Sequence, residues 1–246
     1  MTVQHSTDPG EAAVAIEDQM RAIIARYPKP KSALLPMLHL VQAEYGYVTA
    51  GGIELCADML GLSAAEVSAV ATFYSMYKRR PVGDYHLGVC TNTLCAVMGG
   101  DAIFESLKEH LGVGNDETTP DGVLTLEHIE CNAACDYAPV VMVNWEFFDN
   151  QTPSSARDLV DSLRAGEQVT STRGGVVCSF REVERVLAGF PDGRGAEGPQ
   201  AGPATLVGLR IAKETAEADA KDKLEADGKA SAAADGANRS ANDGEG

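Results

Sequence analysis

Residues 90–95 read CTNTLC and residues 131–135 read CNAAC, so four of the six cysteines in this 246-residue chain lie in two close pairs. They are Cys90, Cys95, Cys131 and Cys135. The first pair follows a predicted strand at residues 85–89, where apolar residues alternate, and the second follows one at about residues 123–129. Because adjacent strands can end at the same edge of a sheet, we expect the two loops to meet and the four sulfurs to converge there.

Four converging thiolates are typical of a structural zinc site or of an iron–sulfur cluster. Zinc sites built on tight turns usually separate paired cysteines by two residues. Here the gaps are wider, four residues in the first pair and three in the second. A wider loop can wrap an object larger than one ion, and a [2Fe–2S] cluster takes two thiolates on each iron. The spacing favours a cluster, and it leaves zinc, redox-active thiols and simple buried cysteines open.

Hydrophobic periodicity outside the two loops predicts an α/β unit of thioredoxin size. The predicted elements are the strand at 85–89, a helix with Ile103, Leu107 and Leu111 that ends at Gly112, the strand at 123–129, a buried run at 140–143, a hairpin arm with Phe147 and Phe148, and a helix from Thr152-Pro153 to Gly166. Thr152 is a good N-cap, and Pro153 suits the first helical position. The order is therefore strand, helix, three strands and helix.

The region before the first strand predicts four short helices. Apolar residues recur at helical spacing from Ile16 to Tyr27, and a second stripe runs from Leu34 to Tyr45. Thr49 is the expected cap of a third helix that stops at Gly61. The tetrapeptide at 63–66, SAAE, is a capping box that starts a fourth. We predict a small helical bundle.

Predicted helices and strands become sparse after Gly166. A capping box at 179–182 starts an amphipathic helix with Phe180 and Leu187 on one face. We expect so short a helix to dock on a partner protein, with packing on its own domain as the alternative. Residues 191–210 are rich in Gly and Pro, and the sequence from Ile211 has almost no large apolar side chain. Such a segment buries too little surface to offset its ordering entropy, so we predict a disordered tail.

The charge balance excludes several classes of partner. The chain has 20 Lys and Arg against 36 Asp and Glu, which gives a net charge of −16. Nucleic acids and anionic lipid surfaces both require a basic surface, so neither is expected as a partner. No stretch approaches the ~20 apolar residues of a membrane span, and residues 1–11 lack the features of a secretion signal. We expect a soluble protein that stays in the compartment where it is made and does not insert into a membrane.

Other residues that can carry chemistry have structural explanations. Cys56, on the apolar stripe of a helix, and Cys178, beside two valines, are expected to be buried small hydrophobes. No histidine has ligand-like spacing. The basic run at 78–80 is expected to be a solvated helix end, and Trp145 is expected to pack in the core or the hairpin.

Both cysteine loops resemble those of the thioredoxin-like [2Fe–2S] ferredoxin family. The similar motifs are Cys90-Thr91-Asn92-Thr93-Leu94-Cys95, Gly99-Gly100 and Glu130-Cys131-Asn132-Ala133-Ala134-Cys135-Asp136-Tyr137-Ala138-Pro139. With the amino-terminal helices included, residues 12–190 resemble the family of the 24-kDa (E) subunit of NADH–quinone oxidoreductase, respiratory complex I. In one respect the chain departs from the family. The second loop often reads Cys-Leu-Gly-Ala-Cys, so Ala133 stands where glycine gives the backbone more freedom.

The resemblance implies that Cys90, Cys95, Cys131 and Cys135 hold one [2Fe–2S] cluster. The cluster would exchange single electrons with FMN, which the family places with NADH on the neighbouring flavin-binding (F) subunit. The large iron–sulfur (G) subunit would be a further partner. The chain would then be an electron-transfer subunit, not catalytic alone, on the cytoplasmic side of the bacterial plasma membrane. Two alternatives stay open: the equivalent subunit of an NAD-linked hydrogenase or formate dehydrogenase, and a zinc-stabilised interaction module.

We therefore predict an α+β protein with five parts. They are a flexible amino terminus at 1–11, a helical bundle at 12–82, a thioredoxin-like [2Fe–2S] domain at 83–168, a partner-docking extension at 169–190 and a low-complexity disordered tail at 191–246.

Overall fold

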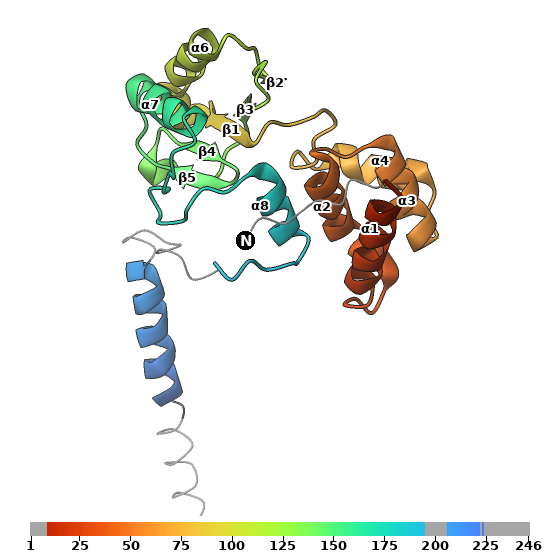
Figure 1. Cartoon of the computed structure of the whole chain (residues 1–246). Coiled ribbons are helices and arrows are strands. Elements are labelled where there is room, and N and C mark those ends of the chain that lie inside the picture. The colour runs from red at the N-terminus through yellow and green to blue at the C-terminus, as the bar shows by residue number, and fades with distance from the viewer. Residues whose placement is uncertain (1–8, 195–205, 222, 224–246) are drawn as a thin grey trace, which may run out of the picture. The chain divides into compact units, whose positions relative to one another are not determined.

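The computed structural model describes residues 9–194, 206–221 and 223, with side chains from residue 16 onward. The chain divides into two compact units, Met1–Gly198 and Pro199–Gly246, and each is considered by itself. The first unit contains all the labelled helices and strands of Figure 1.

The first unit begins with helices. They are α1 (Pro9–Ile24), the 3-10 helix η1 (Pro30–Ala33), α2 (Leu34–Tyr45), α3 (Ala50–Leu60) and α4 (Ala64–Phe73). The predicted caps are confirmed: the Thr49 hydroxyl accepts from the N–H of Gly52, and Ser63 and Glu66 form a capping box. The predicted flexible terminus is wrong at residues 9–11, which form the first turn of α1. Pro9 stands at the first helical position, where a fixed φ suits the helix.

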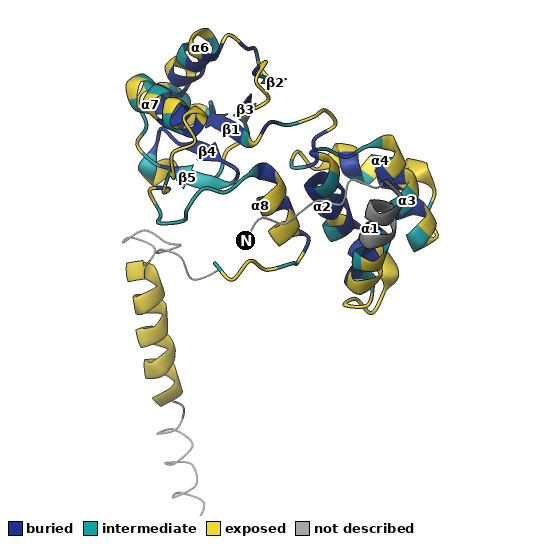
Figure 2. Ribbon diagram, in the orientation of Figure 1, coloured by how far each residue is buried: buried dark blue, intermediate teal, exposed yellow. Residues whose placement is uncertain are grey.

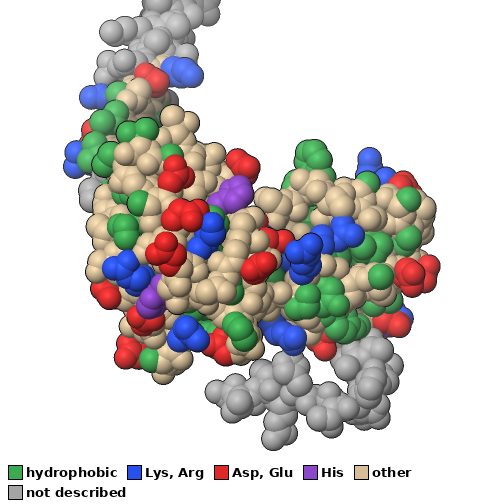
Figure 3. Space-filling model, turned by 90° about the horizontal axis from the view of Figure 1, so that it is seen from above, with side chains coloured by type: hydrophobic (Ala, Val, Ile, Leu, Met, Phe, Trp, Pro, Cys, Tyr) green, Lys and Arg blue, Asp and Glu red, His purple; other side chains and the backbone are tan. Residues whose placement is uncertain are grey.

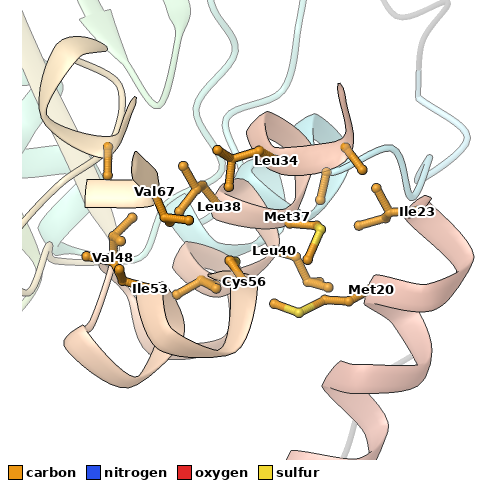
Figure 4. Packing of buried hydrophobic residues seen from close by; sticks show 14 of the residues in the cluster. Met20, Ile23, Leu34, Met37, Leu38, Leu40, Val48, Ile53, Cys56 and Val67 are labelled. Carbon is orange, nitrogen blue, oxygen red and sulfur yellow. The ribbon is translucent and has the colours of Figure 1, made fainter. Parts of the chain in front are cut away.

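These helices share one hydrophobic core (Figure 4). Met20, Met37, Leu38 and Val67 are among its fully buried side chains. Cys56 lies in the same cluster with no exposed surface, and burial raises the pKa of its thiol to about 12. Cys56 is therefore a core residue, as the sequence predicts. Burial of each methionine, leucine or valine of this core stabilises the fold by about 1.5–3 kcal/mol.

The rest of the first unit is a sheet covered by helices. Its strands are β1 (Tyr85–Cys90), β2 (Glu117–Thr118), β3 (Leu124–Ile129), β4 (Val141–Val143) and β5 (Glu146–Phe148), in the order β2-β3-β1-β4-β5. β1 is parallel to β3 and antiparallel to β4. Its helices are α5 (Thr93–Val97), α6 (Gly100–Leu111), the 3-10 helix η2 (Cys135–Tyr137) and α7 (Pro153–Arg164). The predicted order is confirmed; the short β2 and α5 are additional.

One face of the sheet packs against α6 and α7 (Figure 2). Side chains alternate along a strand, so Leu87 and Val89 of β1 enter this core while His86 and Cys90 belong to the opposite face. The strands and both helices contribute to one buried cluster. This packing holds the end of β1, and with it the first cysteine, against a rigid layer.

The extension after residue 169 packs against the chain itself, which is the alternative to the favoured partner surface. Its helix α8 (Phe180–Leu187) packs on α2 of the same chain, and these two helices lie side by side in Figure 1. Phe180 is 1% exposed, and the carboxylate of Glu184 is buried between Nδ1 of His39 at 2.6 Å and Nε2 of Gln42 at 2.8 Å. The buried face of α8 therefore includes a polar contact to α2. Apolar periodicity alone cannot identify that partner.

Lys78 corrects another prediction. It is buried, with Nζ 2.5 Å from Oε2 of Glu127 on β3 and 3.1 Å from the carbonyl of Ser75. Only its neighbours Arg79 and Arg80 are exposed. A lysine stem can cross apolar surface and deliver its charge to a distant carboxylate. The ammonium of Lys78 therefore binds Glu127 in place of the water that the sequence predicts around it.

The second unit differs from the predicted disorder over residues 206–221, which form a helix with every side chain exposed. Alanine is the best helix former, and Arg210 forms an i,i+4 ion pair with Glu214. Local propensity thus accounts for a helix that buries no surface. The remainder of the predicted tail, 195–205, 222 and 224–246, lies outside the described residues, as do residues 1–8.

Acidic and basic side chains are interspersed over the described part of the face seen in Figure 3. Within the described residues, no single helix has the length and apolar composition to cross a membrane; α3 and α4 reach those thresholds only when counted together, across a bend of 119°.

Candidate metal centre

The parallel pairing of β1 and β3 brings the two cysteine loops to one edge of the sheet. In the strand register Cys90, the last residue of β1, lies opposite Ile129, the last residue of β3. Cys131 follows two residues later. The N–H of Cys90 donates to the carbonyl of Val140 at 3.1 Å, which ties the end of β1 to the segment after the second pair. Both loops therefore leave the sheet side by side.

The first loop is held against the start of α6 by two glycines. Cys95 lies buried on α5, and Gly99 follows with a φ of 113°, in the left-handed region. A Cβ on Gly100 would lie 2.5 Å from the carbonyl oxygen of Cys90 and 2.9 Å from that of Cys95. Only glycine allows so close an approach. The Gly99-Gly100 pair after the first cysteine loop is thus a requirement of the loop's packing.

The second loop is more exposed and contains an unusual backbone. Cys131 and Cys135 are both exposed, and Cys135 begins η2. Ala133 has a φ of 54°, a left-handed conformation that costs a residue with a Cβ about 1–2 kcal/mol. Its N–H donates to Sγ of Cys131 at 3.4 Å. The loop therefore keeps a glycine-like turn although alanine occupies the position.

The thiols influence one another across the two pairs. Burial raises the pKa of Cys95 to about 11, against the lowering effect of the Val140 N–H, and Cys90 and Cys135 raise it further. The pKa of Cys135 is raised first by its hydrogen bond with Cys131 and by the charge of that thiol, and then by burial and by Cys90. Four thiolates this close repel one another, and a cationic metal group removes that repulsion. The donor set fits such a group.

The surroundings of the four sulfurs are asymmetric. Cys90 and Cys95 are 3% exposed and share a small apolar cluster with Ala134, Ala138 and Val140. The second pair faces outward. A group held here would be shielded from water on the sheet side and accessible on the other side.

Asn92 is a site residue that sequence reasoning did not single out. Its Nδ2 donates to the carbonyl of Ile129 at 2.9 Å and lies 3.8 Å from Sγ of Cys90. It therefore links the first loop to the end of β3, two residues before the second pair. Asn92 stands at the N-cap of α5, but its side chain makes no capping hydrogen bond, so no local pattern indicates these contacts. Among the described residues, no three His, Cys, Asp or Glu side chains lie close enough together to bind a single metal ion.

Comparison with known proteins agrees with this geometry. Residues 20–164 match the family model of the thioredoxin-like [2Fe-2S] ferredoxin, a range that includes both cysteine pairs. The chain is 65% identical to the E subunit of NADH-quinone oxidoreductase from Mycobacterium tuberculosis strain H37Rv over 208 residues, which cover 84% of this chain and 82% of that one.

The chain belongs to the family of these E subunits. The resemblance of the cysteine loops is thereby confirmed, and the family is one of subunits of an oxidoreductase complex. The E 2 subunit of the same enzyme in Rhizobium meliloti is 37% identical over 158 residues, or 64% of this chain and 94% of that one. Among solved structures, an NAD+-reducing [NiFe]-hydrogenase in the air-oxidised state is similar with a TM-score of 0.49 and 20% identity, over 54% of this chain and 23% of that one.

The other candidate residues of the chain have structural roles in the first unit. His39 and His86 each form a hydrogen bond with a carboxylate, His39 with Glu184 and His86 with Glu127. Trp145 packs against His86 with ring centroids 5.2 Å apart. Cys178 is only half-buried, which corrects the prediction of a core residue. Its sulfur accepts a hydrogen bond from Nη2 of Arg194 at 2.7 Å, a partner that no apolar pattern indicates.

Proposed function

We propose that Cys90, Cys95, Cys131 and Cys135 together hold one [2Fe–2S] cluster. The observation that carries the proposal is the meeting of both cysteine loops at the ends of β1 and β3, in a range that matches the [2Fe-2S] ferredoxin family. When bound, the cluster supplies a one-electron carrier. Two close pairs of thiolates provide two ligands for each iron.

The chain's own groups stabilise negative charge at this site. The N–H of Ala133 donates to Sγ of Cys131, and the N–H of Val140 lowers the pKa of Cys95, which favours its thiolate. Hydrogen bonds to ligand sulfurs favour the reduced, more negative state. The apolar wall of Ala134, Ala138 and Val140 limits water on the buried side.

The proposed role is to exchange single electrons with FMN on a neighbouring, NADH-binding partner, the flavin-binding (F) subunit, within NADH–quinone oxidoreductase. The exposed second pair is the side from which such a flavin is reached. The large iron–sulfur (G) subunit is the proposed second partner, and the complex would hold the chain on the cytoplasmic side of the bacterial plasma membrane. The 65% identity to the mycobacterial relative, across 82% of its length, favours this complex over the equivalent subunit of an NAD-linked hydrogenase or formate dehydrogenase.

Electron transfer to the flavin tests the role directly. The protein is purified without oxygen, its cluster is reduced with dithionite, and the excess reductant is removed. It is then mixed with the flavin-binding (F) subunit that carries oxidised FMN, and the visible spectrum is followed by stopped flow. We expect the cluster to reoxidise while the flavin is reduced, with no such reaction when FMN has been stripped from that subunit. An iron-containing chain whose cluster reoxidises at the same rate with and without FMN contradicts the role.

A further inference from the structure

The second cysteine loop contains a buried hydrogen-bond donor with nothing to bind. Asn132 follows Cys131, and its residue as a whole is half-buried. Its side-chain nitrogen Nδ2, however, is buried and has no hydrogen-bond partner among the described residues. Among the described residues, only one other side-chain nitrogen or oxygen is buried without a hydrogen-bond partner, and it is Nδ1 of His86 on β1.

Such an atom requires an explanation, because a buried donor without an acceptor costs about 1–3 kcal/mol. An asparagine on an exposed loop normally avoids this cost by turning its amide to water. Asn132 instead lies between two sulfur ligands, next to Ala133 in its left-handed conformation. The N–H of Ala133 already donates to a sulfur, that of Cys131. Sulfur is thus the acceptor that this loop offers to its donors.

The missing acceptor has a defined chemistry. A cluster in this site would present sulfide and thiolate sulfurs, which accept hydrogen bonds and cannot donate them when coordinated. The loop between Cys131 and Cys135 lies on the exposed side of the proposed site. A donor fixed inside the loop and shielded from water is placed to meet a sulfur that is present only when the cluster is bound.

We propose that the side-chain amide of Asn132 donates a hydrogen bond to a sulfur of the cluster and thereby raises its reduction potential. The proposal rests on the proposed [2Fe–2S] site and adds to it a residue that is not a ligand. Reduction places one more negative charge on the cluster, so a donor bound to sulfur stabilises the reduced form more than the oxidised form. Asn132 then acts against the carboxylates of Glu130 and Asp136, which flank the same loop.

A redox titration of the cluster-containing protein, followed by electron paramagnetic resonance (EPR), tests this role. Asn132→Leu removes the donor and keeps a side chain of similar size. At the potential where half of the wild-type cluster is reduced, we expect the ratio of reduced to oxidised cluster to fall about threefold to tenfold. This corresponds to a potential lower by roughly 30–60 mV, since tenfold is 59 mV for one electron. Asn132→Gln, which restores an amide, should recover part of the shift.

An unchanged ratio in Asn132→Leu overturns the proposal, since a role in packing alone does not move the potential. A second measurement needs no change at residue 132. The protein is labelled with ¹⁵N only in asparagine side-chain amides and carries Asn92→Ser, which removes the other amide near a ligand. Pulsed EPR of the reduced cluster should show a weak ¹⁵N coupling, and its absence overturns the proposal. A wild-type protein without iron overturns the cluster itself, whereas an iron-containing protein that fails these tests overturns only the role of Asn132.

Discussion

The backbone N–H of Ala133 donates to Sγ of Cys131 across 3.4 Å, in a turn where Ala133 itself has a φ of 54°. The turn that directs this N–H at the sulfur is one that glycine adopts without strain. The neighbouring Ala134 has a φ of −110° and is buried. The methyl group of Ala133 therefore strains the backbone, whereas that of Ala134 packs in the apolar cluster.

Ala133→Gly should therefore stabilise the protein, by about 0.5–1 kcal/mol after allowance for the greater chain entropy of glycine. Ala134→Gly is the matched control, and it should destabilise the protein by about 1 kcal/mol because it removes a buried methyl group and gains no relief from strain. The measurement is the denaturant midpoint of the cluster-containing protein under anaerobic conditions. Equal destabilisation by both substitutions would show that Ala133 is not strained.

Glu130→Gln should raise the reduction potential. For a carboxylate ~7 Å from the cluster, with an effective dielectric constant of ~20, the repulsion of the added electron is about 2 kcal/mol. Solvent screening lowers the expected shift to tens of millivolts. Glu54→Gln, at an exposed position of α3 in the amino-terminal helical region, is the control and should leave the potential unchanged. A redox titration in which Glu130→Gln shows no upward shift contradicts this electrostatic account.

The buried group formed by Lys78, His86 and Glu127 should make stability fall in acid. Burial would raise the pKa of Glu127, but the hydrogen bond from His86 and the charge of Lys78 outweigh it and lower the pKa to about 2. Burial is the main cause that lowers the pKa of His86 below its usual 6.5. Both groups bind protons more readily when the chain is unfolded. Their stabilisation is therefore complete above about pH 6.5 and is lost progressively toward pH 2.

Glu127→Gln tests this relationship. At pH 7 it should lower the free energy of unfolding by about 3 kcal/mol, because the buried ammonium of Lys78 loses its counter-charge. Between pH 4.5 and pH 3 the difference between variant and wild type should shrink, because Glu127 of the unfolded wild type binds a proton there while the folded protein, with its lower pKa, keeps the carboxylate charged. Comparing the two proteins at each pH cancels any loss of stability at the cysteine site that both share. A difference that stays constant with pH would contradict the lowered pKa.

Phe180→Ala should destabilise the isolated chain by about 3–5 kcal/mol, as is typical for a buried phenylalanine. Phe180, the first residue of α8, is 1% exposed, whereas Leu187 at the end of the same helix is 39% exposed. Leu187→Ala should cost less than about 1 kcal/mol. Chemical denaturation of the chain without partners decides the matter. If Phe180→Ala left the chain equally stable and weakened only its binding to the flavin-binding (F) subunit, α8 would be a partner-docking element after all.

Local patterns predicted the elements that position the cysteines. Alternation over residues 85–89 identified β1, and the caps at Ser63, Thr152 and Ser179 were found because a capping side chain is close in sequence to the N–H groups that it binds. The cysteine spacing identified the four candidate ligands. Their meeting at one edge followed from the geometry of adjacent strands, and the parallel pairing of β1 with β3 provides it.

Contacts between distant polar side chains could not be predicted in this way. Glu184 receives hydrogen bonds from residues more than 140 positions away, and Lys78 reaches Glu127 across 49 positions. Polar side chains at such separations leave no periodic signal, so the sequence predicted neither the partners of Glu184 nor the burial of Lys78. The unpartnered amide of Asn132 likewise becomes visible only when every donor in the folded chain is matched with an acceptor.

The most direct test of the account is a count of metal and inorganic sulfide in the anaerobically purified chain, combined with EPR after reduction. We predict two irons and two sulfides per chain, no zinc, and one paramagnetic signal that is lost in Cys95→Ser together with Cys135→Ser. A colourless protein with one zinc per chain and no signal after reduction would contradict the assignment of Cys90, Cys95, Cys131 and Cys135 to a binuclear iron centre.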